Sequence, residues 1–208
     1  MNILNTNKVA QVPLNETPYR YAKIRNMFET NLYNQLCNEY PSVDFTHCET
    51  LSQAKTYSMY MRQLFDSRKK NIKIDNLSEC WSRFINELLS KEYQQALSHH
   101  TQKDLSQYAI EINCWQYPSG GWLSPHTDKP EKIISQLFYF NEQWQDAWGG
   151  EFRVLNSAEE DDIHEIIYPE RNTSVILVRS NNSWHSVAPL TCPPHINRRL
   201  LQIIYWQK

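Results

Sequence analysis

Three side chains in the second half of this 208-residue sequence have the types and spacing of metal ligands. His126 and Asp128 stand two residues apart in PSGGWLSPHTD, and His185 opens the later segment HSVAPL. On a β-strand, residues two apart point to the same face, so His126 and Asp128 can contact one ion. A His-x-Asp arises by chance in roughly one of four sequences of this composition, so the tripeptide needs support from its context.

The candidate ligand set predicts a particular kind of metal chemistry. Two imidazoles and one carboxylate on one face of an octahedral ion leave three positions open, which is the arrangement of non-heme Fe(II) oxygenases. A bidentate co-substrate and O₂ can then bind side by side. The far carboxylate of a keto acid would need a cation, and a guanidinium can contact it through two hydrogen bonds. Arg198 and Arg199 begin the apolar segment RRLLQIIYW, and we expect at least one of them to point into a largely buried space.

Other interpretations of these residues remain open at this point. The sequence has only four glycines, Gly120-Gly121 and Gly149-Gly150, which flank the His-x-Asp segment and are equally typical of two hairpin turns. A metal-dependent hydrolase is less favoured, because HTDKPEK has no second histidine and HEIIY lacks the partner histidine of an HExxH motif. A non-catalytic module that binds or senses a small molecule is the main alternative.

The elements that would position these side chains change in type along the chain. Helical spacing of apolar residues predicts helices over 26–40, over 51–65, and after Asn76, where Asn76 would cap and Glu79 would stand at the third helical position. Short segments rich in β-branched and aromatic residues predict seven strands, over 108–117, 133–140, 151–155, 163–168, 174–178, 184–187 and 199–206. Helices followed by strands indicate an α+β fold with a sandwich or barrel.

Composition limits the domain count and the class of partner. With 208 residues, 40% of them hydrophobic, the chain can form one domain with a sizeable core. The formal net charge is −2 with mixed signs along the chain, which favours a small or neutral ligand and argues against nucleic acid or a membrane surface. Five cysteines without a CxxC pair indicate buried thiols, and the N-terminal sequence lacks the pattern of a leader peptide, so we expect a cytoplasmic protein. The oligomeric state cannot be deduced.

Five segments together resemble the Fe(II)- and 2-oxoglutarate-dependent oxygenases, in particular their prolyl-hydroxylase-like branch. They are YPSGGWLSPHTD, LFYFN, WGGEFRVL, WHSVAPL and RRLLQIIYW, in the family's order, from about Tyr108 to the C-terminus. The resemblance implies a double-stranded β-helix, or jelly roll, with N-terminal helices packed against one sheet. Residues 1–208 would be a single oxygenase domain, mainly helical over 1–104 and with the jelly-roll core over 105–208.

The resemblance also implies a role for each matching residue. His126, Asp128 and His185 would bind Fe(II). Arg199 would pair with the distal carboxylate of 2-oxoglutarate, with Arg198 as the alternative one residue earlier. Tyr139 would donate a hydrogen bond to the same carboxylate, and Tyr117 would line the co-substrate pocket. The sequence departs from the family where many members have a hydroxyl residue two positions after the basic residue, because Leu201, or Leu200, stands there.

The expected activity is hydroxylation of an unactivated C–H bond in a small molecule, a peptide or a sugar. Fe(II) would be bound as the cofactor, 2-oxoglutarate and O₂ would be consumed, and succinate and CO₂ would be released. Ascorbate is a candidate reductant. Trp122, Ser124 and Trp144 are candidate substrate contacts, although aromatic packing over the barrel explains the two tryptophans equally well. The sequence does not identify the substrate.

Overall fold

The strands of the protein form one nearly closed, mostly antiparallel sheet in a computed structural model, which describes residues 3–52, 54–69, 71–72, 74 and 76–208. The strand order is β1-β10-β7-β12-β5-β3-β6-β11-β8-β9, with β2 and β4 paired to β3. The strands are β1 Tyr21–Arg25, β2 Thr46–Ser52, β3 Lys55–Asp66, β4 Asn71–Ile72, β5 Ala109–Tyr117, β6 Trp122–His126, β7 Lys132–Tyr139, β8 Phe152–Leu155, β9 Ile163–Ile167, β10 Thr173–Val178, β11 His185–Val187 and β12 Arg198–Trp206.

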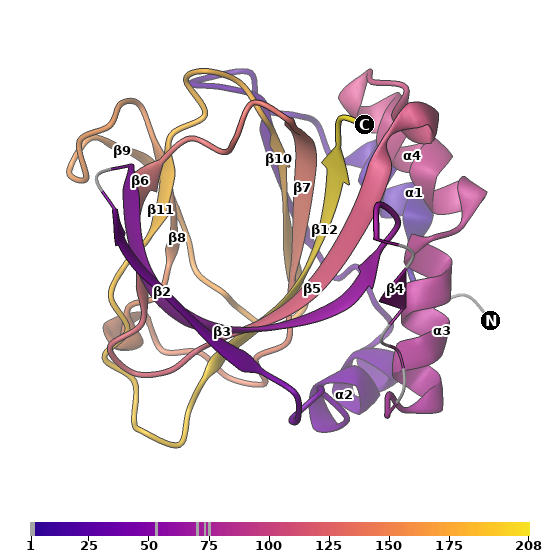
Figure 1. Ribbon diagram of the computed structural model, residues 1–208, viewed down its shortest axis with the longest axis horizontal. Coiled ribbons are helices and arrows are strands. Elements are labelled where there is room, and N and C mark those ends of the chain that lie inside the picture. Colours follow the sequence, from indigo (N-terminus) through magenta and orange to yellow (C-terminus); the bar gives the residue numbers. More distant parts are fainter. Residues whose placement is uncertain (1–2, 53, 70, 73, 75) are drawn as a thin grey trace.

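This strand order gives the two opposed layers of a jelly roll. Figure 1 shows β10, β7, β12 and β5 on one side of the barrel and β6, β11, β8 and β9 on the other. The long strand β3 connects the layers, because it pairs with β5 over one part of its length and with β6 near its start. The predicted double-stranded β-helix is therefore confirmed, and so is each of the seven predicted strands, with boundaries that shift by at most one residue.

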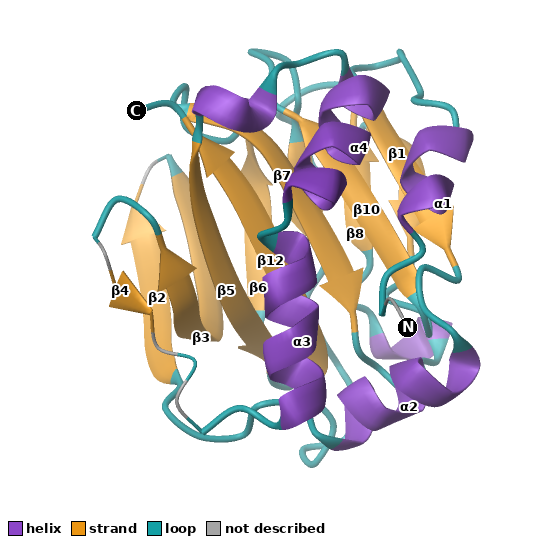
Figure 2. Cartoon of the chain, turned by 90° about the vertical axis from the view of Figure 1, so that its right-hand side faces the viewer, coloured by secondary structure: helices purple, strands orange, loops and turns teal. Residues whose placement is uncertain are grey.

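Four α-helices cover the outer face of the β10-β7-β12-β5 layer (Figure 2). They are α1 Thr6–Gln11, α2 Thr30–Asn38, α3 Glu79–Leu88 and α4 Lys91–Thr101, and two short 3₁₀ helices cover Leu105–Gln107 and Asp146–Trp148. The first predicted helix is present as α2, and the third is present as α3. The cap of α3 is Ser78, whose hydroxyl accepts from the amide of Trp81, rather than Asn76 as predicted. No helix of the described residues is long and apolar enough to cross a membrane.

The predicted helix over 51–65 is wrong, because this segment forms the β2–β3 hairpin. Its apolar residues also fit a period of two, and Tyr57, Met59 and Met61 face the barrel interior as successive residues on one side of β3. Tertiary pairing of β3 with β5 and β6 decides the outcome, since both neighbours supply backbone partners that a helix would not use. The first half of the chain is consequently mixed rather than mainly helical.

Two hydrophobic clusters lie on opposite faces of the helix-covered layer. The first packs the helices on the sheet and includes Trp81, Phe84 and Phe140. The second fills the barrel and includes Met59, Tyr117 and Leu200. The alternation of side chains along each strand assigns them to one cluster or the other, so strand register determines which side chains face the barrel interior.

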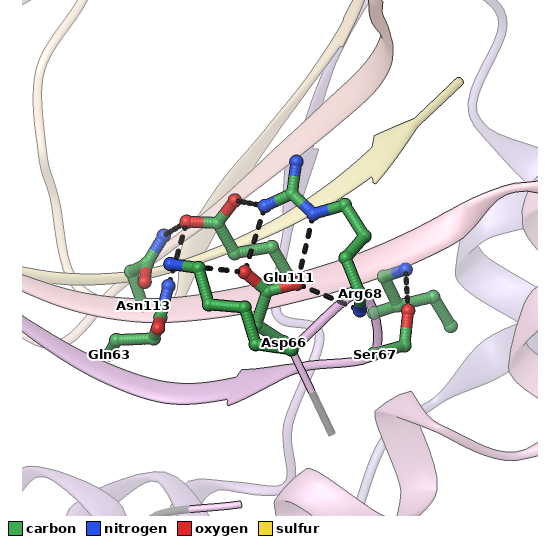
Figure 3. Close-up of polar contacts among 8 residues, drawn as sticks. Gln63, Asp66, Ser67, Arg68, Glu111 and Asn113 are labelled. Atoms are coloured by element: carbon green, nitrogen blue, oxygen red, sulfur yellow. Dashed lines mark hydrogen bonds and ion pairs between the residues drawn. The ribbon is translucent and has the colours of Figure 1, made fainter. Parts of the chain in front are cut away.

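A polar network fixes the pairing of β3 with β5 at the end of β3 (Figure 3). The carboxylate of Asp66 is fully buried and accepts from Nε and Nη2 of Arg68 at 2.9 and 3.0 Å. The same guanidinium contacts Glu111 of β5 at 2.5 Å, and Glu111 also accepts from the side-chain amide of Asn113 at 2.8 Å. These contacts satisfy the buried carboxylate of Asp66 and join the two strands next to a register shift between Gln63 and Phe65.

Candidate metal centre

The two histidines of the candidate ligand set face each other across an antiparallel strand pair. His126 ends β6 and His185 begins β11, and they are direct partners in the β6–β11 register with ring centroids 4.3 Å apart. Asp128 follows β6 by two residues, as its spacing from His126 predicts. One potential ligand atom from each of the three residues lies within 4.8 Å of the other two, and all three residues are buried. Among the described residues this is the one group of three or more His, Cys, Asp or Glu with that geometry.

Both imidazoles are oriented by the same local contact. Nδ1 of His126 hydrogen-bonds the carbonyl of Ser124 at 2.9 Å, and Nδ1 of His185 hydrogen-bonds the carbonyl of Ser183 at 2.9 Å. Because a carbonyl only accepts, each Nδ1 carries the proton in this arrangement and each Nε2 keeps its lone pair. The ring of Phe152 stacks on His185 at 5.4 Å and limits its rotation. The two Nε2 atoms are therefore available as metal ligands.

Burial and local charge set the protonation of the three candidate ligands. Burial, helped by the neighbouring His185, lowers the pKa of His126 to about 3, and burial also lowers the pKa of His185. Burial alone would raise the pKa of Asp128, but the ammonium group of Lys132 at 2.7 Å and the two imidazoles outweigh it, so the pKa is lowered. The cluster thus offers two neutral nitrogens and one anionic oxygen. That donor set suits Fe(II) with open coordination positions.

The three ligand candidates line a cavity of about 300 Å³ inside the barrel. Its walls combine apolar and aromatic side chains with three cations. The lining residues are Cys48, Lys55, Tyr57, Met59, Met61, Trp115, Tyr117, Leu123, His126, Asp128, Lys132, Leu137, Phe152, His185, Val187, Arg198, Leu200 and Gln202. A concave, largely apolar site with a few convergent polar groups is the usual form of a small-molecule site.

Arg198 is a buried cation in this cavity and has no carboxylate partner among the described residues. Its exposed fraction is 1%, and its Nη2 donates to the hydroxyl of Tyr139 at 3.2 Å. The guanidinium carbon lies 4.9 Å from the ring centres of both Tyr117 and Tyr139, while Nε is buried without a hydrogen-bond partner. A buried guanidinium without an anion is costly. The arrangement fits an anionic group that completes the site.

Arg199 does not line the cavity. Its Nη1 donates to the carbonyl of Cys37 at 3.2 Å and its guanidinium lies over the ring of Tyr40, on the helix-covered side of the sheet. Side chains alternate along β12, so Arg198, Leu200 and Gln202 share the inner face and Arg199 is on the outer one. The expectation that Arg199 faces the co-substrate pocket is therefore corrected. Arg198, the alternative one residue earlier, is the arginine whose side chain lines the cavity.

The two predicted tyrosines both lie beside Arg198, and Tyr117 lines the cavity whereas Tyr139 is not among its lining residues. Burial raises the pKa of Tyr117 to about 12 even though Arg198 opposes the shift, and burial also raises the pKa of Tyr139. Both phenols therefore keep their protons at neutral pH. Because the Tyr139 oxygen accepts from Arg198, its own proton is free to be donated to a third group.

The three predicted substrate contacts lie outside the cavity lining. Indole Nε1 of Trp122 donates to the hydroxyl of Thr56 at 2.9 Å, and the hydroxyl of Ser124 accepts from the Thr56 amide at 2.7 Å. Trp144 donates to the carbonyl of Gly149 at 3.0 Å and packs against Trp148. All three side chains are used in holding strands and loops together. Leu123, between Trp122 and Ser124, faces the cavity instead.

The contributions of β3 and Lys132 to this cavity were not predicted from the sequence. Lys55, Tyr57, Met59 and Met61 enter it from alternate positions of β3. The period-two pattern of these four residues was the available signal, and the assignment of the segment to a helix concealed it. Nothing in the local sequence places Lys132 beside Asp128 with its side chain directed inward.

Known protein families support the interpretation of this cluster as an Fe(II) site. Residues 112–207 match the family model described as the 2OG-Fe(II) oxygenase superfamily, which covers the candidate ligands and both arginines. The matched residues lie within the jelly-roll core that holds the candidate site. The protein is accordingly a 2-oxoglutarate-dependent oxygenase, and the family implies Fe(II), 2-oxoglutarate and O₂. None of the curated protein sequences matches the chain significantly.

Solved structures share the fold of this oxygenase at low sequence identity. A prolyl-4-hydroxylase from Pseudomonas putida superposes with a TM-score of 0.64 at 14% identity, over 98% of this chain and 97% of that one. An oxidoreductase of the 2OG-Fe(II) oxygenase family from Burkholderia pseudomallei gives a TM-score of 0.65 at 14% identity, over 90% and 85% of the two chains. A Trichoplax adhaerens prolyl hydroxylase, in complex with a hypoxia inducible factor oxygen degradation domain peptide fragment, gives 0.60 at 17% identity, over 98% and 88%.

Proposed function

We propose that this oxygenase hydroxylates an unactivated C–H bond of a small molecule or of a peptide residue, with His126, Asp128 and His185 as its iron ligands. The observation that carries the proposal is the combination, in one cavity, of this ligand cluster with the buried and unpaired guanidinium of Arg198. An iron site alone would not require the buried cation. A co-substrate with one carboxylate for the metal and another for a guanidinium uses both.

Arg198 and Tyr139 have complementary roles in holding 2-oxoglutarate. In the proposal, Arg198 pairs with the distal carboxylate and Tyr139 donates its free phenolic proton to the same group. Arg199 has no part in this contact, because it donates to Cys37 on the other face of β12. The walls formed by Leu137 and Leu200 exclude water from the co-substrate and strengthen the ion pair.

The chain supplies geometry and shielding to the reaction rather than a protein acid or base. Fe(II), O₂ and 2-oxoglutarate supply the oxidising chemistry when bound, with release of succinate and CO₂. The carbonyl contacts at Nδ1 hold both imidazoles with Nε2 directed at one point. The aromatic and apolar cavity walls hold the substrate C–H bond near that point and keep solvent away from it.

The substrate class has partial support from the shape of the site and from similar structures. A cavity of about 300 Å³ must hold 2-oxoglutarate and the reacting part of the substrate, which suits a small molecule or one side chain of a peptide. The solved Trichoplax adhaerens enzyme contains a peptide fragment, which supports a peptide as one candidate. A sugar is less well supported, because the described lining has few neutral hydrogen-bonding groups.

Anaerobic binding followed by turnover tests the proposal. Protein mixed with Fe(II) and 2-oxoglutarate without oxygen should give a visible charge-transfer band, and admission of O₂ should then yield succinate. His185→Ala should abolish the band because one imidazole ligand is lost. Neither band nor succinate with the unmodified protein would contradict the proposal. Tight binding of 2-oxoglutarate without iron retention would instead favour a non-catalytic binding module.

A further inference from the structure

Two lysines lie at the end of the cavity opposite Arg198. In the antiparallel β7–β12 pair, Leu200 is opposite Tyr139 at one end and Trp206 is opposite Lys132 at the other. With a rise of about 3.4 Å per residue, six residues of β12 place these pairs roughly 20 Å apart. Lys55 reaches the same end from β3, where the neighbouring Thr56 amide contacts Ser124 next to the end of β6. The cavity therefore has cations at both ends.

The ammonium group of Lys132 is held in place by two different contacts. It lies 2.7 Å from Oδ1 of Asp128, and its side chain is only 15% exposed. It also lies 5.5 Å from the ring centre of Trp206, and the guanidinium of Arg68 stands 4.6 Å from a ring of the same indole. The network around Arg68 in Figure 3 thus supports the indole that Lys132 contacts. These contacts keep Lys132 directed into the cavity rather than into solvent.

Lys55 lines the cavity without an acidic partner of its own among the described residues. Its ammonium group lies 5.2 Å from the ring centre of Tyr57, and no carboxylate of the described residues is within ion-pair distance. Burial lowers the pKa of Lys55, and the nearby Lys132 lowers it further, while the more distant Asp128 opposes the shift. An additional anion beside Lys55 and Lys132 would stabilise the charged form of Lys55 against its burial and against the charge of Lys132.

The net charge of the cavity would still be positive with Fe(II) and 2-oxoglutarate bound, so a further anion would be attracted to it. The described lining has three cationic side chains, Lys55, Lys132 and Arg198, against the single carboxylate of Asp128. The two imidazoles add no charge as metal ligands, because each would bind iron through the lone pair of Nε2 while Nδ1 keeps its proton on a backbone carbonyl. An Fe(II) ion and a 2-oxoglutarate dianion cancel each other, so the loaded cavity keeps a surplus of two positive charges. A site with that surplus attracts an anionic substrate.

The wall next to the lysines is apolar and aromatic. Tyr57, Met59 and Met61 from β3 lie along it, together with Trp115 and Leu123 from the adjoining strands β5 and β6. Methionine and aromatic side chains pack favourably on apolar or aromatic groups. The substrate that fits this end combines an apolar body with a negative charge.

We propose that Lys55 and Lys132 form an anion subsite that binds a carboxylate of the primary substrate, whose apolar part packs along β3. This inference rests on the proposed function, because it assigns the substrate class of the same cavity. The carboxylate belongs either to a free organic acid or to an acidic residue of a peptide. Lys55 supplies a free charge, and Lys132 shares its charge between Asp128 and the substrate.

Binding of matched acids and amides to the protein loaded with Fe(II) and 2-oxoglutarate, without oxygen, tests the subsite. Calorimetric titrations would compare phenylacetate, 3-phenylpropionate and indole-3-acetate with their amides, and a blocked tripeptide containing Glu with the same peptide containing Gln. We expect at least one acid to bind about tenfold or more tightly than its amide. Preference among the free acids indicates a small-molecule substrate, and preference confined to the peptide pair indicates an acidic peptide.

Variants of Lys55 separate a charge contact from a structural role. Lys55→Gln should reduce the acid preference to about threefold or less without changing amide affinity, and Lys55→Arg should retain it. Lys91→Gln, at an exposed lysine of α4 outside the cavity lining, is the control and should change nothing. No preference for any acid, or equal weakening of acids and amides by Lys55→Gln, would overturn the subsite. The charge-transfer band and succinate formation would remain in that case, whereas their loss would mean that the proposed function itself is wrong.

Discussion

The guanidinium of Arg198 donates a hydrogen bond to the hydroxyl of Tyr139 at 3.2 Å, and both side chains are buried inside the barrel. The contact joins the first residue of β12 to the last residue of β7. It uses one donor of the guanidinium and leaves the phenolic proton free. The pair therefore has donors left for an anion, and Arg198 lines the same cavity as the histidine and aspartate cluster.

Replacing Arg198 should weaken binding of 2-oxoglutarate much more than replacing Arg199. Loss of a buried, bidentate guanidinium contact costs about 2–5 kcal/mol, so Arg198→Ala should raise the apparent KM for 2-oxoglutarate by roughly 30-fold or more. Steady-state succinate formation at varied 2-oxoglutarate concentration measures this.

Arg199→Ala provides the matched control one residue away. It removes a hydrogen bond to the Cys37 carbonyl and leaves the cavity intact, so the KM should change less than about threefold while stability falls slightly. A larger KM effect for Arg199→Ala than for Arg198→Ala would show that the assignment of the two arginines is reversed.

Tyr139→Phe should have a smaller effect on the same measurement. The variant keeps the ring beside Arg198 and removes the hydroxyl that accepts from Arg198 and can donate to the co-substrate. We expect the KM for 2-oxoglutarate to rise about 5- to 20-fold, which corresponds to the loss of one charge-assisted hydrogen bond. Iron content, measured after dialysis, should stay the same, and a loss of iron would indicate that the tyrosine supports the metal ligands instead.

Gly149→Ala should destabilise the fold far more than Gly120→Ala. Both glycines have positive φ, +66° and +80°, so each substitution carries a backbone penalty of about 1 kcal/mol or more. A Cβ at Gly149 would also overlap the carbonyl oxygen of Pro189, whereas a Cβ at Gly120 meets open space. Urea unfolding should show a loss of about 1 kcal/mol for Gly120→Ala and of at least about 3 kcal/mol for Gly149→Ala. Equal losses would mean that the close approach of the Pro189 carbonyl oxygen to Gly149 does not limit which residue the fold accepts there.

Asp66→Asn should reduce stability in a pH-dependent way. The Arg68 contact lowers the pKa of Asp66 in the folded state, so the carboxylate contributes stability above the unfolded value near 3.8, and this contribution is lost as the pH falls through the folded value. We expect Asp66→Asn to cost about 1–3 kcal/mol at pH 7 and clearly less near pH 3. Urea unfolding at several pH values measures the difference. A cost that is constant with pH would show that the charge of Asp66 has no role.

Seven of the eight strands in the second half of the chain, all except β6, were predictable because each carries a local signal. Segments such as 174–178 and 199–206 are rich in β-branched and aromatic residues and end at turn residues, and they form β10 and β12. The two-residue spacing of His126 and Asp128 similarly requires only a local extended backbone. The β2–β3 hairpin was missed because its apolar residues fit both a helical and an extended period, and only pairing with β5 and β6 distinguishes them.

By itself, the sequence determined the jelly-roll class, the oxygenase family and the residue types of the candidate metal site, because these depend on local patterns and on the order of motifs. Tertiary structure alone decided which arginine enters the barrel, since the register of β12 against β5 and β7 determines that Arg198 faces inward and Arg199 outward. It also brought Lys55 and Lys132 to one end of the cavity from strands far apart in the chain. A charge surplus of this kind arises from the closure of the barrel, and no local pattern in the sequence encodes it.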